Sequence, residues 1–459
     1  MLRNLRKVPN RYSLARPEHM FLLALGSAIG IGNLLVLPPL MARYGVSSVF
    51  LTHLFLLFFV ALPLVLSEML WSRWLQRSLG QSFELVPRIG KLIWGIIILL
   101  WIDLTPSYLV EYSRILLSLF RFHWQQPVEM YLGQIHNDSV GEALTIYLVA
   151  ACAIVVGTFV VSMTKLRLIL LYRWGLGFVG LALLLLLGVL LANVDVSFVA
   201  SRIQILDFSR FGVDPLMEIL TYSLFSMSVG IGIYFAYVFY GSQASSNHET
   251  ASRFWQRPGN LFRMIFRVFA VDLLFSILAL FLLMPHLNSN GNYVAVSEEI
   301  LSPEYFAVFL FPRYLASIVD VGVIATVAYY VIILVAGFFS LVSLIDVAFW
   351  TFDFELKLSR LRKQLLLVFL LVLLLAAPLL PLIRELVSDF GSGVLLPISA
   401  LCWSLAAGWV IPRKVQSMLF GRGPRLDGLF TLWRFSVRWL LPAIFLSLFI
   451  LRSLKRVGM

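Results

Sequence analysis

Long apolar runs are the feature of this 459-residue chain that most restricts its fold. A transmembrane helix needs about 20 predominantly apolar residues. The candidate segments are residues 20–44, 47–71, 92–120, 144–163, 168–194, 215–240, 264–285, 314–352, 364–383, 391–411 and 437–451. The sequence therefore predicts an all-α polytopic membrane protein with about eleven transmembrane helices.

The composition excludes several other classes of protein. Hydrophobic residues make up 60% of the chain and charged residues 13%, and the mean hydropathy is +0.91. A soluble domain carries about 45–50% apolar and about 25% charged residues, so a soluble enzyme, a disordered chain and a secreted disulfide scaffold are excluded. Cys152 and Cys402 each lie inside an apolar run, and we expect neither a zinc site nor a disulfide framework. We also expect no cleaved signal peptide, because the first apolar run is too long and leads into further spans.

Lysine and arginine are unevenly distributed between the spans. If all eleven runs cross the membrane, the segments on one side are residues 1–18, 72–91, 164–173, 242–267, 353–363 and 413–438. These segments hold 26 of the 36 basic residues and only six acidic ones. Because cytoplasmic loops carry an excess of Lys and Arg, we expect a cytoplasmic N-terminus. The expected location is the plasma (inner) membrane. The net charge of +12 is thus expected to set the topology rather than to bind nucleic acid. Arg452, Lys455 and Arg456 then lie outside, against the rule, but early helices usually dominate the orientation.

Two glycine motifs lie about 200 residues apart, at Ile29–Gly32 in the first span and at Val229–Gly232 in the sixth. Glycine in a helix interior costs about 1 kcal/mol relative to alanine, so both spans are predicted to be interrupted. Backbone groups freed inside a membrane must face a cavity, an ion or a ligand. Carbonyl oxygens suit a cation and helix N-termini suit a carboxylate. Close helix packing through small residues remains the alternative explanation.

The motifs divide the chain into two halves of five spans each. The predicted organisation is a single transporter domain over residues 1–459. Its first repeat covers about 18–194, its inverted second repeat about 215–412, and an extra helix about 437–451. Such a repeat with broken helices is typical of secondary transporters that bind substrate and ions near the membrane midplane.

The first span carries the sequence ALGSAIGIGNLLVLPP at residues 24–39. It resembles the first-helix signature of the neurotransmitter:sodium symporter family. Further similar segments are Pro63 to Arg73 in the second helix, Phe225 to Tyr240 in the sixth, Phe311-Pro312 before the eighth, Ala336 to Arg360 in the eighth and Arg438 to Pro442 in the eleventh. The resemblance covers nearly the whole chain. It implies a leucine-transporter-type fold, a divergent bacterial-type member of the amino-acid branch, and a transporter rather than an enzyme.

The resemblance also implies sites for one or two sodium ions. The first would be formed by the Ala28 carbonyl, Asn33, Ser226 and Asp272. The second would use the Gly26, Ile29 and Ala336 carbonyls with the Ser340 hydroxyl. Hard oxygen ligands of this kind suit an alkali cation. Asp272 stands in an apolar run, where a lone aspartate costs about 2.5–3.5 kcal/mol on insertion scales and marks a functional site by default.

The implied substrate is a small amino acid. Gly30 stands where relatives that bind amines without a carboxylate have an aspartate, so the substrate's own carboxylate would lie there. Apolar neighbours favour a neutral hydrophobic side chain. The residues implied in substrate binding are Ala28, Gly30, Gly32, Leu34, Tyr108 (with Tyr112 as its alternative), Phe225, Ser226, Ser228, Ile231 and Ser340.

Some positions match the family pattern and others depart from it. Three gating positions are kept as Arg11, Tyr240 and Asp389, whereas Val36 and Leu14 replace the arginine and tryptophan of the two gates.

Phe339 replaces one hydroxyl ligand of the second sodium site, so coupling to one sodium ion is expected as much as coupling to two. Ser276 could suit chloride, and chloride dependence stays open. Glu68 either binds an ion or braces the interrupted sixth helix.

Two alternatives to sodium-coupled import remain, a proton-coupled transporter and a solute sensor that binds without transport. A membrane enzyme is disfavoured, because the six histidines have no metal-binding spacing. Among them only His53, within the second helix, merits mutation. The expected partners are an amino-acid substrate and the lipid bilayer, and the oligomeric state is left open.

Overall fold

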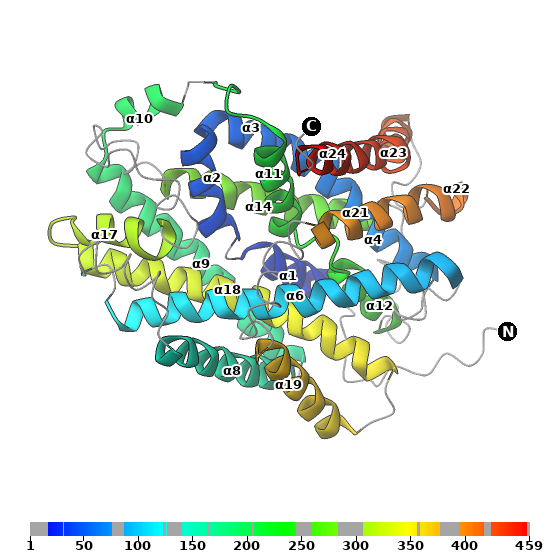
Figure 1. Ribbon diagram of the computed structural model, residues 1–459, viewed down its shortest axis with the longest axis horizontal. Helices are drawn as coiled ribbons and strands as arrows, with labels where there is room; N and C mark the ends of the chain where they lie inside the picture. Colours follow the sequence, from blue (N-terminus) through cyan, green and yellow to red (C-terminus); the bar gives the residue numbers. More distant parts are fainter. Residues whose placement is uncertain are drawn as a thin grey trace.

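The computed structural model is all-helical over the residues that it describes (Figure 1). These are residues 17–30, 32–75, 87–122, 125, 140–162, 165–203, 206–244, 259–282, 306–355, 359–376, 394–416 and 424–456. Their helices, with π-helical turns labelled η, are α1 (Pro17–Ala28), η1 (Gly32–Val36), α2 (Leu37–Tyr44), α3 (Val46–Leu56), η2 (Leu57–Ala61), α4 (Leu62–Leu75), α6 (Pro87–Phe120), α8 (Val140–Ser162), α9 (Lys165–Asn193), α10 (Val196–Ile203), α11 (Val213–Ser226), α12 (Ile233–Ala244), α14 (Asn260–Leu282), η5 (Phe306–Leu310), α17 (Phe311–Ala316), α18 (Gly322–Glu355), α19 (Arg360–Ala376), α21 (Leu396–Leu405), η8 (Ala406–Val410), α22 (Arg413–Gln416), α23 (Pro424–Phe435), η10 (Ser436–Leu440) and α24 (Leu441–Arg456).

Eight of the described segments are long and apolar enough to cross a membrane. Leu396–Val410 is a shorter apolar helix that corresponds to the predicted tenth span, and Gln364–Leu373 corresponds to the ninth. The predicted sixth span is divided between α11 and α12. The chain is therefore an integral membrane protein, and the count of eleven spans stays a prediction.

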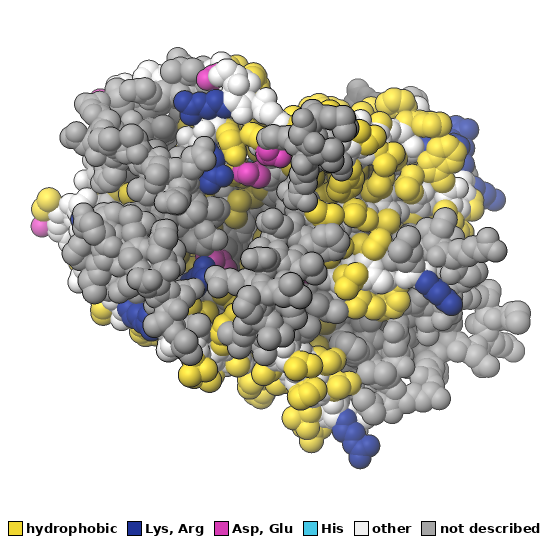
Figure 2. Space-filling model, in the orientation of Figure 1, with side chains coloured by type: hydrophobic (Ala, Val, Ile, Leu, Met, Phe, Trp, Pro, Cys, Tyr) yellow, Lys and Arg dark blue, Asp and Glu magenta, His cyan; other side chains and the backbone are white. Residues whose placement is uncertain are grey.

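Exposed apolar side chains cover the outer helices. Trp174, Leu185 and Phe159 are 75%, 66% and 64% exposed, and Figure 2 shows hydrophobic side chains over much of the described surface on the face drawn. Large apolar patches are rare on soluble monomers. This surface fits a lipid environment.

The broken first span lies in the interior of the bundle. α1 packs against α9, α12, α14 and α18, and α18 in turn packs against α6, α8 and α9. Figure 1 shows α1 near the centre, beside α18, against which it packs. The unwound segments are therefore held away from lipid by other helices, as the hydrogen-bonding needs of free backbone groups require.

Two predicted span boundaries were wrong. Residues 314–352 are not one helix, because α17 ends at Ala316 and α18 begins at Gly322. The turn between them has Asp320 at a φ of 67°. Thr326 Oγ1 lies 2.8 Å from the Gly322 carbonyl of its own helix and 3.1 Å from the Pro312 carbonyl across the turn. Apolar residues continue through this turn, so the hydrophobic pattern did not reveal it. The last helical stretch also begins well before residue 437, at Pro424.

Candidate functional site

The first span is interrupted at its glycine motif, as predicted. α1 ends at Ala28, and the Ile29 N–H makes a closing bond to the Leu25 carbonyl (2.8 Å). Helical structure resumes in η1 and continues in α2, whose first turn holds Pro38 and Pro39.

The sixth span is interrupted as well. α11 ends at Ser226 and α12 begins at Ile233. Gly230 and Gly232 have φ angles of +88° and +84°, and Ser228 has a φ of 52°. Left-handed backbone costs an L-residue about 1–2 kcal/mol, so glycine at these two positions permits the unwound segment.

The backbone groups of this unwound segment are bound by side chains from three other helices. The Gly230 N–H donates to Glu68 Oε1 (2.6 Å), and the Gly230 carbonyl accepts from the Ser399 hydroxyl (2.5 Å). The Ile231 carbonyl accepts from Trp101 Nε1 (2.8 Å). An unpaired buried backbone group costs about 1–3 kcal/mol. These contacts remove that cost for the Gly230 N–H, the Gly230 carbonyl and the Ile231 carbonyl.

Glu68 therefore occupies the bracing position that was one of its two expected roles. It lies in α4 and is fully buried, and α4 packs against α12. Its contact with Gly230 connects the second span to the break in the sixth. Whether Glu68 also binds an ion stays an open prediction.

We expect Gly230→Ala to destabilise the protein by about 1–2 kcal/mol, the cost of left-handed backbone for alanine. A Cβ there would also lie 3.1 Å from Leu396 Cδ1 and 3.5 Å from the Leu396 carbonyl. Gly180→Ala in α9 is the matched control, because nothing lies within 4 Å of its added Cβ. Thermal unfolding of the purified variants tests this, and an equal effect of the two substitutions would contradict the strained-turn account.

A buried polar cluster connects the two breaks to α14. Asn33 Nδ2 donates to Asp272 Oδ1 (2.7 Å). The Ser226 hydroxyl lies 2.7 Å from Asn33 Oδ1 and 2.9 Å from Asp272 Oδ1, and Tyr222 OH donates to Asn33 Oδ1 (3.1 Å). Asp272 is fully buried. Three of the four residues expected at the first sodium site are thus brought into contact.

One oxygen of this cluster fits a further ligand. Among the described residues, Asp272 Oδ2 has no hydrogen-bond partner. A buried carboxylate is strongly disfavoured unless it is paired. The donor set of carboxylate, amide and hydroxyl oxygens suits a hard cation such as sodium. Ala28, expected to add its carbonyl, is buried at the end of α1.

The expected second sodium site is less well formed. Ser340 Oγ lies 3.4 Å from the Gly26 carbonyl. Ile29, in the first span, and Ala336, in the same helix as Ser340, are also buried. Phe339, in place of a hydroxyl ligand, packs against Tyr172 with the two rings tilted and their centroids 4.6 Å apart. Tyr172 also contacts Gly26, and no side chain could be added there without meeting its ring. Aromatic rings therefore pack where the family pattern has a polar ligand.

The substrate-binding residues implied by the resemblance gather at the breaks. Gly30 lies against Ser340, and a Cβ at Gly30 would lie 3.8 Å from Tyr108 OH. Tyr108 OH donates to the Gly337 carbonyl (2.9 Å), and its ring centroid is 6.3 Å from that of Phe225. Of the two third-helix tyrosines, Tyr108 is thus the one placed at the break.

Other members of that set join the two broken spans to each other. Ser228 Oγ donates to the Ser27 carbonyl (2.7 Å). A Cβ at Gly32 would lie 3.3 Å from the Phe225 ring. Leu34 and Ile231 are buried in the unwound regions. Of the gating residues, Arg11, Asp389 and the Tyr240 side chain lie outside the described residues.

Several residues of this region were missed by sequence reasoning. Trp101, Ser399 and Tyr222 hold the unwound segment or the polar cluster, and Tyr172 fills space beside Gly26. None belongs to a motif, and each contacts residues more than 120 positions away. The only local signal was the presence of a polar side chain in an apolar span.

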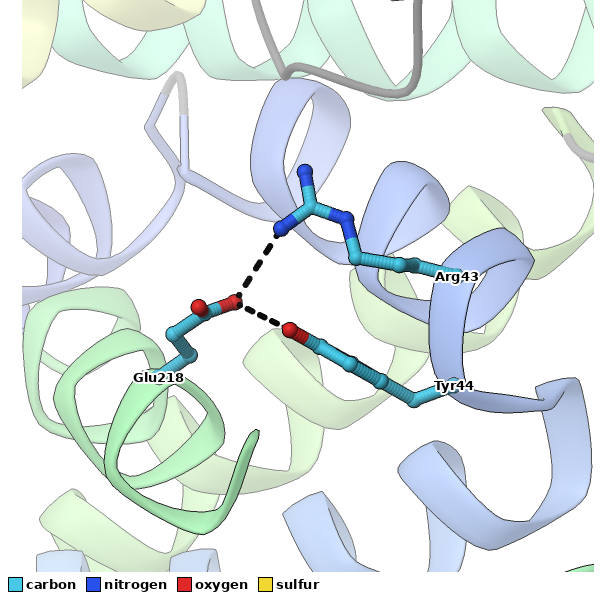
Figure 3. A network of polar contacts seen from close by, with 3 residues as sticks. All are labelled: Arg43, Tyr44 and Glu218. Carbon is cyan, nitrogen blue, oxygen red and sulfur yellow. Dashed lines mark hydrogen bonds and ion pairs between the residues drawn. The ribbon is translucent and has the colours of Figure 1, made fainter. Parts of the chain in front are cut away.

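A second polar network joins the other ends of the same two spans. Figure 3 shows Arg43 and Tyr44, at the end of α2, both directed at one oxygen of Glu218 in α11. The Arg43 Nη1–Glu218 Oε2 distance is 3.4 Å and the Tyr44 OH–Glu218 Oε2 distance is 3.2 Å. An exposed ion pair contributes only about 0–1 kcal/mol. The network thus connects the end of α2 to α11 and is expected to add little to stability.

No protein-family model matches the chain, and no curated protein matches it significantly. Among solved structures it is similar to MhsT, in a crystal structure of MhsT in complex with L-phenylalanine. The TM-score is 0.76 at 20% sequence identity, over 94% of this chain and 98% of the MhsT chain. The resemblance found in the sequence is thus confirmed at the level of the fold: this chain has the leucine-transporter-type fold of MhsT.

Proposed function

We propose that this chain is a sodium-coupled secondary active transporter that imports a small amino acid by alternating access. The observation that carries the proposal is the Asn33–Ser226–Asp272 cluster. It places a buried carboxylate, with one oxygen left for a further ligand, where the first and sixth spans unwind. The likeness to MhsT supports the same assignment.

Sodium is a transported substrate in this account. Asp272 Oδ2, Asn33 Oδ1, the Ser226 hydroxyl and the Ala28 carbonyl would bind it. These ligands belong to different helices, so the ion stabilises conformations in which the helices approach one another. Ion binding can shift a conformational equilibrium only through different affinities for the two states. The broken helices would move with the ion while the other spans serve as a scaffold.

The amino acid would bind beside the two breaks. Its carboxylate would lie at Gly30, where the unwound backbone offers N–H groups. The Tyr108 and Ser340 hydroxyls lie at this position, and Phe225 and Ile231 provide apolar surface. MhsT was crystallised with L-phenylalanine, which supports a neutral hydrophobic side chain. The N-terminus is proposed to be cytoplasmic and the membrane the plasma (inner) membrane.

A thermal-shift screen of amino acids, with and without sodium, tests this function. A ligand that binds only the folded state stabilises it by about 2.7 kcal/mol at 100 times its Kd. The expected result is stabilisation by neutral hydrophobic amino acids that requires sodium and is absent with potassium. Stabilisation that is identical in the two salts would favour the solute sensor or the proton-coupled transporter.

We further propose that one sodium ion accompanies each amino acid. Phe339 and Tyr172 pack against each other beside the Gly26 carbonyl, where the second ion would need polar ligands. Fluxes of radioactive sodium and amino acid into proteoliposomes would measure the ratio. The expected ratio is about one, since Asn33, Ser226 and Asp272 are in contact whereas Phe339 stands where the second site would need a hydroxyl ligand. A ratio of two would refute the one-ion scheme.

A further inference from the structure

The proposed function gives no role to a group of basic and aromatic side chains at the junction of the predicted tenth and eleventh spans. Arg413 lies in α22, Arg434 in α23 and Arg438 in η10. Trp409 in η8 and Trp439 in η10 are 49% and 55% exposed. These five residues are called the basic–aromatic cluster below.

The cluster is built where two π-helical turns cross. η8 packs against η10, and a Cβ at Gly408 would lie 3.0 Å from Arg438 Cα, so glycine lets the two backbones approach. Ser404 Oγ donates to the Val437 carbonyl (2.6 Å), and Trp409 Nε1 donates to the Arg438 carbonyl (3.3 Å). π-helical turns are frequent at functional sites. This crossing holds Arg438 beside Trp409.

The guanidinium group of Arg438 lies over both indole rings. Its central carbon is 4.1 Å from the centroid of the Trp409 ring and 5.8 Å from that of the Trp439 ring. The two ring centroids are 5.0 Å apart. A guanidinium placed over an aromatic face keeps the N–H groups along its edge available for hydrogen bonds. The rings therefore orient Arg438 without neutralising it.

The arginines of the cluster repel one another, since Arg434 feels the charges of both Arg413 and Arg438. Within the described ranges, no carboxylate forms an ion pair with any of the three. The nearest acidic residue along the chain, Asp427, precedes Arg434 by about two helical turns. The Nε atoms of Arg434 and Arg438 are buried and have no hydrogen-bond partner in the part of the chain that the structure describes. Buried donors and gathered like charges are both stabilised by an anion.

The cluster lies at the border of an apolar surface. Leu405 and Val410 on one side of the crossing and Phe435 on the other are exposed. In Figure 2, basic side chains border hydrophobic ones in the region where Figure 1 labels α22 and α23. Tryptophan is enriched at membrane–water interfaces. Residues 413–438 also form one of the segments expected on the cytoplasmic side, where the leaflet carries anionic lipids.

We propose that the basic–aromatic cluster binds the headgroup phosphate of an anionic phospholipid. Arg413, Arg434 and Arg438 would donate N–H groups to the phosphate oxygens, which the planar guanidinium group suits. Trp409 and Trp439 would pack against the lipid at the level of its glycerol backbone. Basic pockets between transmembrane helices on the cytoplasmic side bind headgroups of this kind. The bound lipid would connect α22 to η10, independently of sodium and amino acid.

Native mass spectrometry of the purified full-length protein in nonionic detergent tests this inference. The protein is titrated with phosphatidylglycerol or with phosphatidylcholine of the same acyl chains, and the bound lipid is quantified. The wild type is expected to bind phosphatidylglycerol more tightly. Because each basic residue near a headgroup contributes about a factor of five, Arg413→Gln and Arg438→Gln should each raise the Kd for phosphatidylglycerol about fivefold, and the double variant about 25-fold. The Kd for phosphatidylcholine should not change.

Arg263→Gln is the matched control. Arg263 is an exposed arginine near the start of α14, in another segment expected on the cytoplasmic side, and its substitution should leave both Kd values as in the wild type. Arg413 is itself exposed, so Arg413→Gln tests the inference even if Arg438→Gln does not fold.

Three results would overturn the inference. One is equal affinity of the wild type for the two lipids. The second is the same loss of affinity in Arg263→Gln as in Arg413→Gln, because the preference would then come from overall charge. The third is displacement of phosphatidylglycerol by an equal concentration of glycerol phosphate, which would indicate a site for a soluble phosphate instead of a lipid.

Discussion

Asp272→Asn is expected to weaken sodium binding by about 10- to 100-fold. The substitution is nearly isosteric, and an amide oxygen can still accept the bonds that Asn33 and Ser226 make to Asp272 Oδ1. The negative charge is lost, and interactions of charged groups contribute about 1.5–3 kcal/mol, where 1.4 kcal/mol is a factor of ten. Sodium titrations of substrate binding would measure the change.

Asp103→Asn provides the control for this prediction. Asp103 is also a buried carboxyl residue in a membrane-spanning helix, α6, but it has no place in the proposed site. Because Asp103 contributes no ligand to the proposed site, its substitution should leave the sodium dependence of substrate binding unchanged. Unchanged sodium activation in Asp272→Asn would count against the site assignment.

Glu68→Ala is expected to cause the second large effect, a loss of stability of about 1–3 kcal/mol from the unsatisfied Gly230 N–H together with loss of transport. Glu68 Oε1 is the acceptor for that N–H, and the unwound segment would lose one of its three side-chain supports. Thermal unfolding and amino-acid uptake of the same preparation would be measured.

Glu68→Gln distinguishes bracing from ion binding. Glutamine retains the acceptor oxygen, so stability and transport should remain close to those of the wild type. If Glu68→Gln unfolds normally but loses its response to sodium, then Glu68 binds an ion and the bracing account is wrong.

The breaks in the membrane helices could be predicted from the sequence because their cause is local. Gly30 and Gly32 in one span, and Gly230 and Gly232 in another, interrupt otherwise apolar helices, and the structure unwinds both spans at these motifs. Asp272 could be singled out for a similar reason, since an isolated carboxylate among apolar residues requires a partner.

Other features have no local signal. The turn between α17 and α18 is hidden by an apolar run that continues through it. Tyr172 and Phe339 occupy the region of the expected second sodium site only because α9 and α18 pack together. The hydrogen bonds of His53 to Ser223 and Ser276 likewise depend on helix packing across 170 and 223 residues.

Uptake of radiolabelled L-phenylalanine into proteoliposomes under an inward sodium gradient tests the central claim most directly. The account predicts accumulation above the external concentration, collapse of that accumulation when sodium is equal on both sides, and loss of it in Asp272→Asn. Saturable binding of the amino acid without accumulation, or accumulation that does not depend on sodium, would contradict the assignment of a sodium-coupled transporter.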